Sequence, residues 1–357
     1  QNHNPIVAPA NSSYNIIRIG PNNEQLGTFW TAKPKQNKAT QAFIMIHGKL
    51  RNGGDYWTIM NNIVKNAVEN NVTGVDPDAI VVAPEFFSAR DNSGQYDNNT
   101  LAWGDVNAWQ AGEKAIHPAG SGVSSFDALD SLANKFLDVT QYPRLQKLTI
   151  IGHGGGGQLI QRYATVGSVD SNDRVHIRFI HGDPSSCNYF TTDRPTIDGQ
   201  TLPTKDSCPT YNTWRYGFDN FTASSGPTKK PQEYFQQYIS RDVVSIVGYQ
   251  DTQASGDNYC MAVMQGGSAR RDRNLIWWRY INTLANTGED LDGFPGNFDN
   301  LPDWSNLVNN NTFGIRLLVV EDADHDAELV FESAEGRAAL FDVNSSSFPT
   351  GWRPAGW

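Results

Sequence analysis

The segment with the clearest chemical character is a glycine-rich turn between two apolar stretches. Residues 148–151 predict a buried strand, 152–157 a tight turn, and an amphipathic helix is expected to follow. In a Gly-x-Ser-x-Gly nucleophile elbow, a serine stands at such a turn in a strained conformation, and the residues two before and two after it must be small. Gly152 and Gly156 meet that requirement. The position that should carry the nucleophile is Gly154.

A nucleophile elbow needs a carboxylate and a histidine, which follow it along the chain in that order. Asp251 comes just after an apolar run at 243–247, and His325 follows another at 315–320. Both therefore leave the ends of predicted strands. Asp183 and Asp257 are alternative candidates for the carboxylate that orients the histidine.

Backbone amides that could hold a developing negative charge are also predicted. The first fully apolar run, 42–46, ends at His47-Gly48-Lys49. The N–H of Lys49 at this strand end, together with the N–H of Gly155 in the elbow, would form an oxyanion hole. The ammonium group of Lys49 is expected to be solvated.

The same glycines match a competing motif. Gly152, Gly154 and Gly157 fit the Gly-x-Gly-x-x-Gly fingerprint of dinucleotide-binding proteins. That fingerprint expects an acidic residue at the end of the next strand, about 20 residues on. Here the first acidic residue after that strand is Asp183, later than expected, and four predicted strands precede the motif. We therefore favour the elbow.

Other candidate site residues carry weaker signals. His325 lies among the acidic residues Asp322, Asp324, Asp326 and Glu328, but this group lacks a recognisable metal-ligand spacing, and we predict no metal site. His153, beside the elbow, is expected to be a packing residue rather than a second base, and it is also a candidate for the substrate site. Trp103 and Trp109 lie in a long polar stretch that should border the cleft, so they are equally candidates for the core and for substrate binding.

Predicted strands and helices alternate along the chain, the pattern of an α/β fold with a mostly parallel central sheet flanked by helices. We expect one domain over residues 1–357, with a substrate-side excursion at about 86–122 and a lid or cap insertion at about 184–240. The predicted strands are 14–19, 27–32, 42–46, 79–83, 148–151, 175–180, 243–247 and 315–320. The predicted helices are 56–69 with Asp55 as its cap, 125–137, one through Tyr163, 273–286 and 327–341.

Composition narrows the possible partners. A net charge of −10 argues against binding nucleic acid, and no apolar run is long enough to span a membrane. We expect a secreted, extracellular protein, because glycosylation sequons recur in polar stretches, at Asn11, Asn71, Asn98, Asn220, Asn310 and Asn344. The chain has 3 cysteines, and we predict a disulfide between Cys187 and Cys208, which bracket a polar loop, with Cys260 buried in an apolar run.

Taken together, the chain resembles fungal and bacterial secreted α/β-hydrolases of the serine-esterase kind. The matching segments are His47-Gly48 with Arg51-Asn52, the glycine elbow, Asp183-Pro184-Ser185-Ser186, residues 248–252, Gln265-Gly266 and residues 323–326. The resemblance implies an α/β-hydrolase fold and hydrolysis of a carboxylic ester or lactone, small or polymeric, without a cofactor. It places Gly154 at the nucleophile position, His325 as general base and Asp251 as the carboxylate that orients it.

The glycine at position 154 is the one departure from this pattern, and it has three explanations. A serine could have been replaced to inactivate an enzyme. The chain could be a natural protein that binds a ligand without turning it over. It could also be a non-hydrolytic enzyme that uses His325 as a base for cyclisation or elimination. We favour the first, because Asp251 and His325 are both retained. The aromatic-rich predicted lid further leads us to expect a bulky apolar or aromatic substrate.

Overall fold

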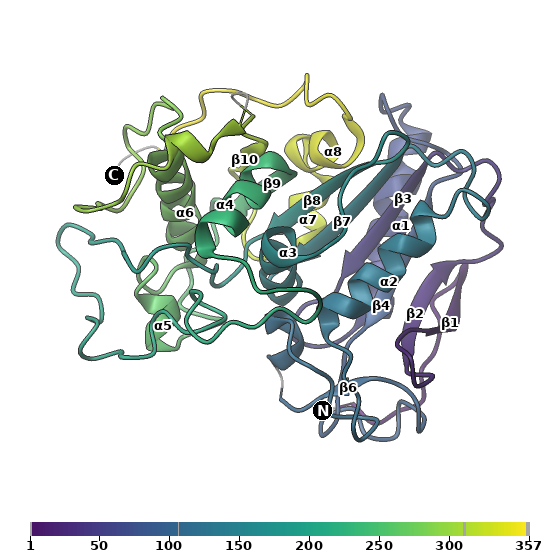
Figure 1. Ribbon diagram of the computed structural model, residues 1–357. Helices are drawn as coiled ribbons and strands as arrows, with labels where there is room; N and C mark the ends of the chain where they lie inside the picture. Colours follow the sequence, from purple (N-terminus) through teal and green to yellow (C-terminus); the bar gives the residue numbers. More distant parts are fainter. Residues whose placement is uncertain (1, 106, 310–311, 355–357) are drawn as a thin grey trace.

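A computed structural model describes residues 2–105, 107–309 and 312–354 (Figure 1). Across these residues the main sheet has eight strands in the order β1-β2-β4-β3-β7-β8-β9-β10. The strands are β1 (Ser12–Arg18), β2 (Gln25–Thr31), β3 (Gln41–Ile46), β4 (Ile80–Glu85), β7 (Lys147–His153), β8 (His176–Gly182), β9 (Asp242–Gly248) and β10 (Ile315–Val320). A small second sheet pairs β5 (Phe87–Ser88) with β6 (Ala102–Trp103).

Most of the main sheet is parallel, as predicted. Antiparallel pairing is confined to β1 with β2 and β2 with β4, while the strands from β4 to β10 pair in parallel. Every residue of β3, β4 and β7 is buried. Strands covered on both faces carry apolar side chains at successive positions, which explains the continuous apolar runs in the sequence.

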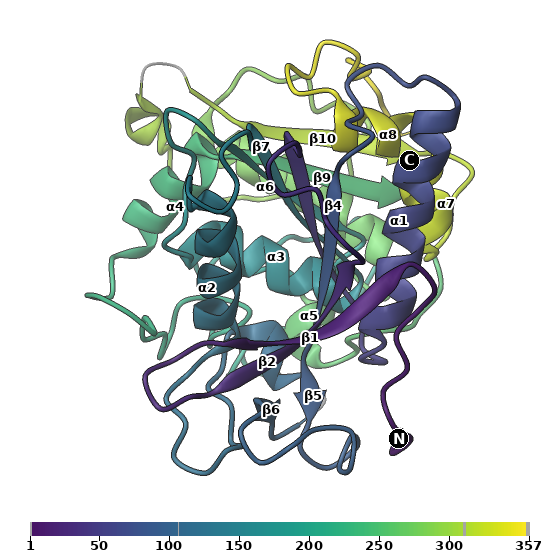
Figure 2. The same cartoon turned by 90° about the vertical axis from the view of Figure 1, so that its right-hand side faces the viewer.

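Helices cover both faces of the sheet (Figure 2). Helices α1, α7 and α8 lie on one side, and α2, α3, α4 and α6 on the other, so that each face of the sheet has its own buried apolar cluster. The helices are α1 (Gly53–Glu69), α2 (Ser125–Leu137), α3 (Gly155–Val166), α4 (Pro231–Ser240), α5 (Cys260–Val263), α6 (Arg270–Ala285), α7 (Ala327–Glu332) and α8 (Ala334–Phe341). Short 3-10 helices occur at η1 (Ala108–Ala111) and η2 (Ser305–Leu307).

Three helix predictions need correction at their ends. Helix α1 begins two residues before Asp55, which lies in its first turn, and the residue at the cap position is Asn52. Helix α6 begins at Arg270 rather than at residue 273. The predicted closing helix is two helices, because the hydroxyl of Ser333 accepts a hydrogen bond from the N–H of Gly336 and starts α8 anew.

The two predicted insertions differ in what they contribute. The excursion at 86–122 contains η1, and Asn107 and Gln110 from this region line the main pocket. The segment predicted as a lid ends in α4, which packs on α3. From residues 184–240, Ser185 lines the pocket, while the aromatic rings of Phe190, Phe218 and Tyr234 pack against one another.

The predicted disulfide is wrong. Cys208 is bonded to Cys260, with Cα atoms 5.9 Å apart, and Cys187 is a buried free thiol. The apolar run around Cys260 had been interpreted as core, but it forms the short helix α5, directly after residues that line the pocket. The bond therefore ties the predicted lid to one wall of the pocket.

Candidate functional site

The turn between β7 and α3 has the geometry of a nucleophile elbow. Gly154 has φ 57° and ψ −114°, a strained combination for any residue with a side chain. Its N–H donates to the carbonyl of Gly182, and its carbonyl accepts the first hydrogen bond of α3, from the N–H of Gln158. A Cβ on Gly152 would lie 2.2 Å from backbone atoms of Gly156, so the expected need for small flanking residues is met in the structure.

The structure brings His325 and Asp251 together beside this turn. Nδ1 of His325 lies 2.9 Å from a carboxylate oxygen of Asp251, and the same carboxylate accepts two hydrogen bonds from Arg270, at 2.7 and 2.8 Å. Burial alone would raise the pKa of Asp251, but the hydrogen bonds from His325 and Arg270 lower it on balance. Asp251 is therefore an ionised, fully buried anchor for the imidazole.

The other imidazole nitrogen of His325 faces Gly154. A Cβ built on Gly154 would lie 2.9 Å from Nε2 of His325. Burial lowers the pKa of His325, and the hydrogen bond to Asp251 offsets this only in part. The imidazole is thus neutral at neutral pH and can act as a base at the place where a side chain on residue 154 would project.

Two backbone amides, those of Lys49 and Gly155, also lie beside the elbow. A Cβ on Gly155 would lie 3.2 Å from the amide nitrogen of Lys49, so the loop after β3 approaches the start of α3 closely. Among the described residues, neither the amide of Lys49 nor that of Gly155 has a hydrogen-bond acceptor. Two such N–H groups close together, one of them at the N-terminus of α3, are suited to bind an oxyanion.

His47 fixes the loop that carries the amide of Lys49. Its Nδ1 donates to the carbonyl of Gly48, and its Nε2 accepts from the N–H of Phe86. Burial lowers the pKa of His47 to about 3, so the ring is neutral and can make both contacts at once. The side chain orients the loop without reaching the pocket.

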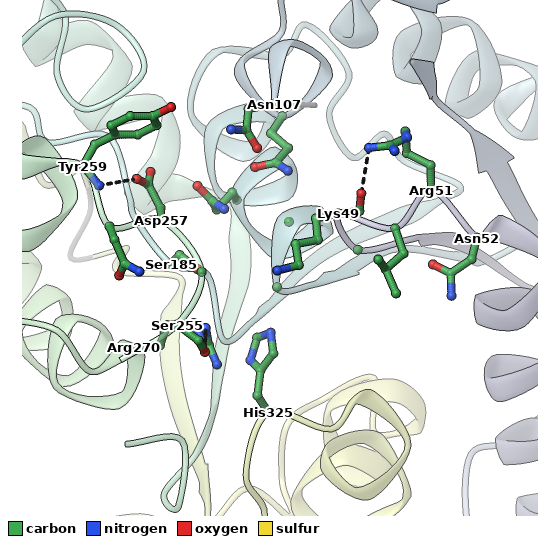
Figure 3. Close-up of a pocket in the computed structure, with 18 of the residues that line it drawn as sticks. Lys49, Arg51, Asn52, Asn107, Ser185, Ser255, Asp257, Tyr259, Arg270 and His325 are labelled. Carbon is green, nitrogen blue, oxygen red and sulfur yellow. Dashed lines mark hydrogen bonds between the residues drawn. The ribbon is translucent and has the colours of Figure 1, made fainter. Parts of the chain in front are cut away.

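These groups share one pocket of about 750 Å³. Gly154, Gly155, Lys49 and His325 all line it, and Tyr259 stands at one side. In Figure 3, His325 and Asn107 lie at opposite ends of the pocket, with Asp257 and Arg51 on opposite walls between them. The predicted positions 49, 154, 155, 251 and 325 therefore converge on a single place in the fold.

Three predicted substrate-binding residues lie elsewhere. Trp103 and Trp109 are fully buried in the core rather than at the cleft, and both pack against Phe86. The excursion instead presents polar side chains from Asn107 and Gln110 to the pocket.

His153 is a buried packing residue, the first of the two alternatives. Its ring packs against that of His325, with centroids 4.5 Å apart, and is not among the groups that line the pocket. Its Nε2 lies 3.1 Å from Asp183, whose other carboxylate oxygen accepts from the N–H of Gly248. The remaining alternative for the orienting acid, Asp257, accepts from the hydroxyl of Tyr216. Asp251 is thus the carboxylate that contacts His325.

One group of described residues has potential metal-ligand atoms close together. His153, Asp183 and His325 each offer one such atom within 4.8 Å of the others. Hydrogen bonds from His153 to Asp183 and from His325 to Asp251 account for the placement of these side chains. The acidic residues around His325 that drew attention in the sequence do not belong to this group.

Sequence reasoning missed Arg270, Gln110 and Gln158. No spacing in the sequence links Arg270 to Asp251. Gln158 lies four residues after Gly154, one turn along α3, so its position on the face of the elbow could have been found from helical periodicity.

Comparison with known proteins defines the fold. No family model matches the chain, and no curated protein matches it. Among solved structures, poly(aspartic acid) hydrolase-1 from Sphingomonas sp. KT-1 is similar, with a TM-score of 0.58 and 16% identity over 91% of this chain and 96% of that one. A poly(3-hydroxybutyrate) depolymerase from Bordetella parapertussis has a TM-score of 0.56 and 16% identity over 93% and 91%. The chain has an α/β-hydrolase fold.

This fold argues against the competing interpretation of the glycines as a dinucleotide-binding motif. The strand order, with β3 and β7 at the centre and an antiparallel β2, differs from the 3-2-1-4-5-6 order of a dinucleotide-binding domain. Asp183, which would have to bind a ribose, is fully buried and engaged by His153 and Gly248.

The glycosylation sequons that fall within the described residues lie at the surface. The sequon residues Asn11, Asn71, Asn98, Asn220 and Asn344 are exposed, while Asn310 lies outside the described residues. Among the residues described, no helix has the length and apolar character needed to cross a bilayer.

Proposed function

We propose that this chain is the serine-to-glycine form of a fungal-like carboxylic ester or lactone hydrolase, which binds its ester and leaves it intact. The observation that carries the proposal is the position of His325. The ring is anchored by Asp251 and directs Nε2 at the spot where a side chain on the strained residue 154 would project. The proposal needs no cofactor.

The pocket supports a specific pose for the ester. Its carbonyl carbon would lie above Gly154, with the carbonyl oxygen accepting from the N–H groups of Lys49 and Gly155. With a serine at position 154, the hydroxyl would attack the carbonyl carbon while its proton passes to Nε2 of His325. The imidazolium would then give that proton to the departing alcohol, and water would release the acid by the reverse sequence.

The chain with glycine lacks only the attacking oxygen. Without it no acyl-enzyme bond can form, although the amides, the imidazole and the pocket remain. We expect a small-molecule or polymeric ester as the ligand and an extracellular location, with glycans on some of the exposed sequons. Nucleic acid is not an expected partner, given the net charge of −10.

Gly154→Ser and Gly154→Ala form the matched pair that tests this proposal. Both place a Cβ at the same strained position, and they differ in one oxygen. Across a panel of 4-nitrophenyl esters and lactones, Gly154→Ser should hydrolyse at least one substrate, while Gly154→Ala and the unsubstituted chain should not. If Gly154→Ser is folded but inert, and the unsubstituted chain converts a substrate without hydrolysis, the site is that of a non-hydrolytic enzyme.

A further inference from the structure

Several side chains that line the pocket end in carboxamides. Two of them, Gln110 and Gln158, are 2% and 5% exposed. A third, Asn107 at the N-terminus of η1, lies at the end of the pocket opposite His325 in Figure 3. Buried carboxamides need hydrogen-bonding partners, so those that face the pocket indicate what a ligand must supply.

The amide group of Gln158 has a fixed orientation. Its Oε1 accepts from the hydroxyl of Ser186 at 2.8 Å and from the guanidinium of Arg162 at 3.4 Å. Arg162 is fully buried and can only donate, so the oxygen of Gln158 must face it. The NH2 group is then directed to the opposite side. Among the described residues it has no acceptor, and it lies at the pocket.

Gln110 is placed by the same arginine. The backbone carbonyl of Gln110 accepts a hydrogen bond from Arg162 at 3.1 Å. The side chain of Gln110 lies beside the start of α3. A Cβ on Gly155 would lie 2.8 Å from Nε2 of Gln110. Gly155 has no positive φ, so its backbone does not require glycine. The missing side chain makes room for the carboxamide of Gln110 beside the oxyanion amides.

The direction of the ester in the pocket follows from the proton transfer. His325 must reach the oxygen of the departing alcohol, so the alcohol lies at the His325 end. The acyl group then extends away from it, toward Gln110 and Gln158. A purely hydrocarbon acyl chain would cover two amide donors without offering an acceptor, which is unfavourable.

We propose that Gln110 and Gln158 form a subsite for an acyl group that carries a hydroxyl or carbonyl oxygen near the ester carbonyl. The ligand class is therefore a hydroxyacyl or oxoacyl ester rather than an ester of a simple fatty acid. This inference rests on the proposed function, since it uses the same pocket and the same pose of the ester.

The test compares two esters that differ at one group. In Gly154→Ser, 4-nitrophenyl 3-hydroxybutyrate should be hydrolysed with a kcat/KM about tenfold or more above that of 4-nitrophenyl 3-methylbutyrate, in which a methyl replaces the hydroxyl. Adding Gln158→Met removes the carboxamide at a similar side-chain volume, so position 158 offers the ligand hydroxyl neither an amide donor nor an amide acceptor. Arg162 keeps its bonds to the backbone carbonyls of Arg215 and Gln110 and to Ser186. This change should abolish the preference for the hydroxy ester, and residual hydrolysis of the methyl ester shows that the variant is folded. Gln200→Leu, an exposed change outside the pocket, is the control.

A binding measurement separates this inference from the proposed function. If Gly154→Ser hydrolyses neither ester, the proposed function fails. The unsubstituted chain can still be titrated with methyl 3-hydroxybutyrate and methyl 3-methylbutyrate by calorimetry. Tighter binding of the hydroxy ester, lost in Gln158→Met, supports the subsite. Equal affinity for both esters, or a preference that survives Gln158→Met, overturns it.

Discussion

Nε2 of His325 lies 2.9 Å from the point that a Cβ on Gly154 would occupy, closer than such atoms approach in folded proteins. Any side chain at position 154 must therefore displace the imidazole by a few tenths of an ångström and adopt a φ near 57°. The ring can yield, because its side chain is 34% exposed and comes from a loop. Glycine relieves both the crowding and the backbone strain.

The first prediction concerns stability. Gly154→Ala and Gly154→Ser should each lower the free energy of unfolding by about 1–3 kcal/mol, and by similar amounts, because the strain belongs to the Cβ and the backbone. Urea unfolding of the three proteins measures this. A serine form as stable as the glycine form would mean that the turn carries no such strain.

The second prediction concerns pH. In Gly154→Ser, activity needs a neutral imidazole, and kcat/KM falls as His325 gains a proton. Burial lowers the pKa of His325, with partial compensation by Asp251. The midpoint of the acid limb should therefore lie below the ordinary imidazole value of about 6.5. A kcat/KM profile from pH 4 to 9 decides this, and a midpoint above that value would show that the carboxylate outweighs burial.

The third prediction concerns the carboxylate. Asp251→Asn in the Gly154→Ser background should lower kcat by about 10⁴-fold, because the amide can stabilise the wrong tautomer of His325. It should also destabilise the protein by about 3–5 kcal/mol, since Arg270 is 3% exposed and loses its counter-charge. Asp257→Asn is the comparison, because Asp257 does not contact the imidazole. Similar losses of kcat in both variants would contradict the assignment of Asp251, rather than Asp257, as the acid that orients His325.

The fourth prediction concerns the disulfide. The bond between Cys208 and Cys260 spans a sequence separation of 52. A loop of that length corresponds to about 4 kcal/mol in the chain-entropy model. Replacing both cysteines by serine should cost about that much on urea unfolding, whereas Cys187→Ala leaves the bond in place. Peptide mapping without reductant checks the pairing, and a Cys187–Cys208 peptide would refute the structure here.

The sequence predicted the parts of the site that depend on strand ends. Buried parallel strands give long apolar runs, and residues 49, 154, 251 and 325 follow such runs directly, so their convergence could be expected from the fold. The glycines of the elbow could be predicted equally well, because the backbones at Gly152 and Gly156 approach too closely to leave room for a side chain.

The rest depended on long-range packing that no local pattern encodes. Trp103 and Trp109 are residues of a type that often contacts substrates. They are buried because the segment 86–122 folds so that both rings pack against Phe86. Cys260 looked like a core residue because its neighbours are apolar. Gln110 and Gln158 are positioned by hydrogen bonds from Arg162. Arg162 is a buried charge, and it lies 52 residues after Gln110 in the sequence.

Covalent labelling at position 154 tests the central claim, that this residue occupies the nucleophile position, without requiring the natural substrate. Gly154→Ser should react with a fluorophosphonate to one adduct per chain, and peptide mass spectrometry should place that adduct on the introduced serine. Gly154→Ala should stay unmodified, and His325→Ala in the serine background should slow the reaction by orders of magnitude. A folded Gly154→Ser protein that gains no adduct at position 154, or labels equally well without His325, would contradict the account.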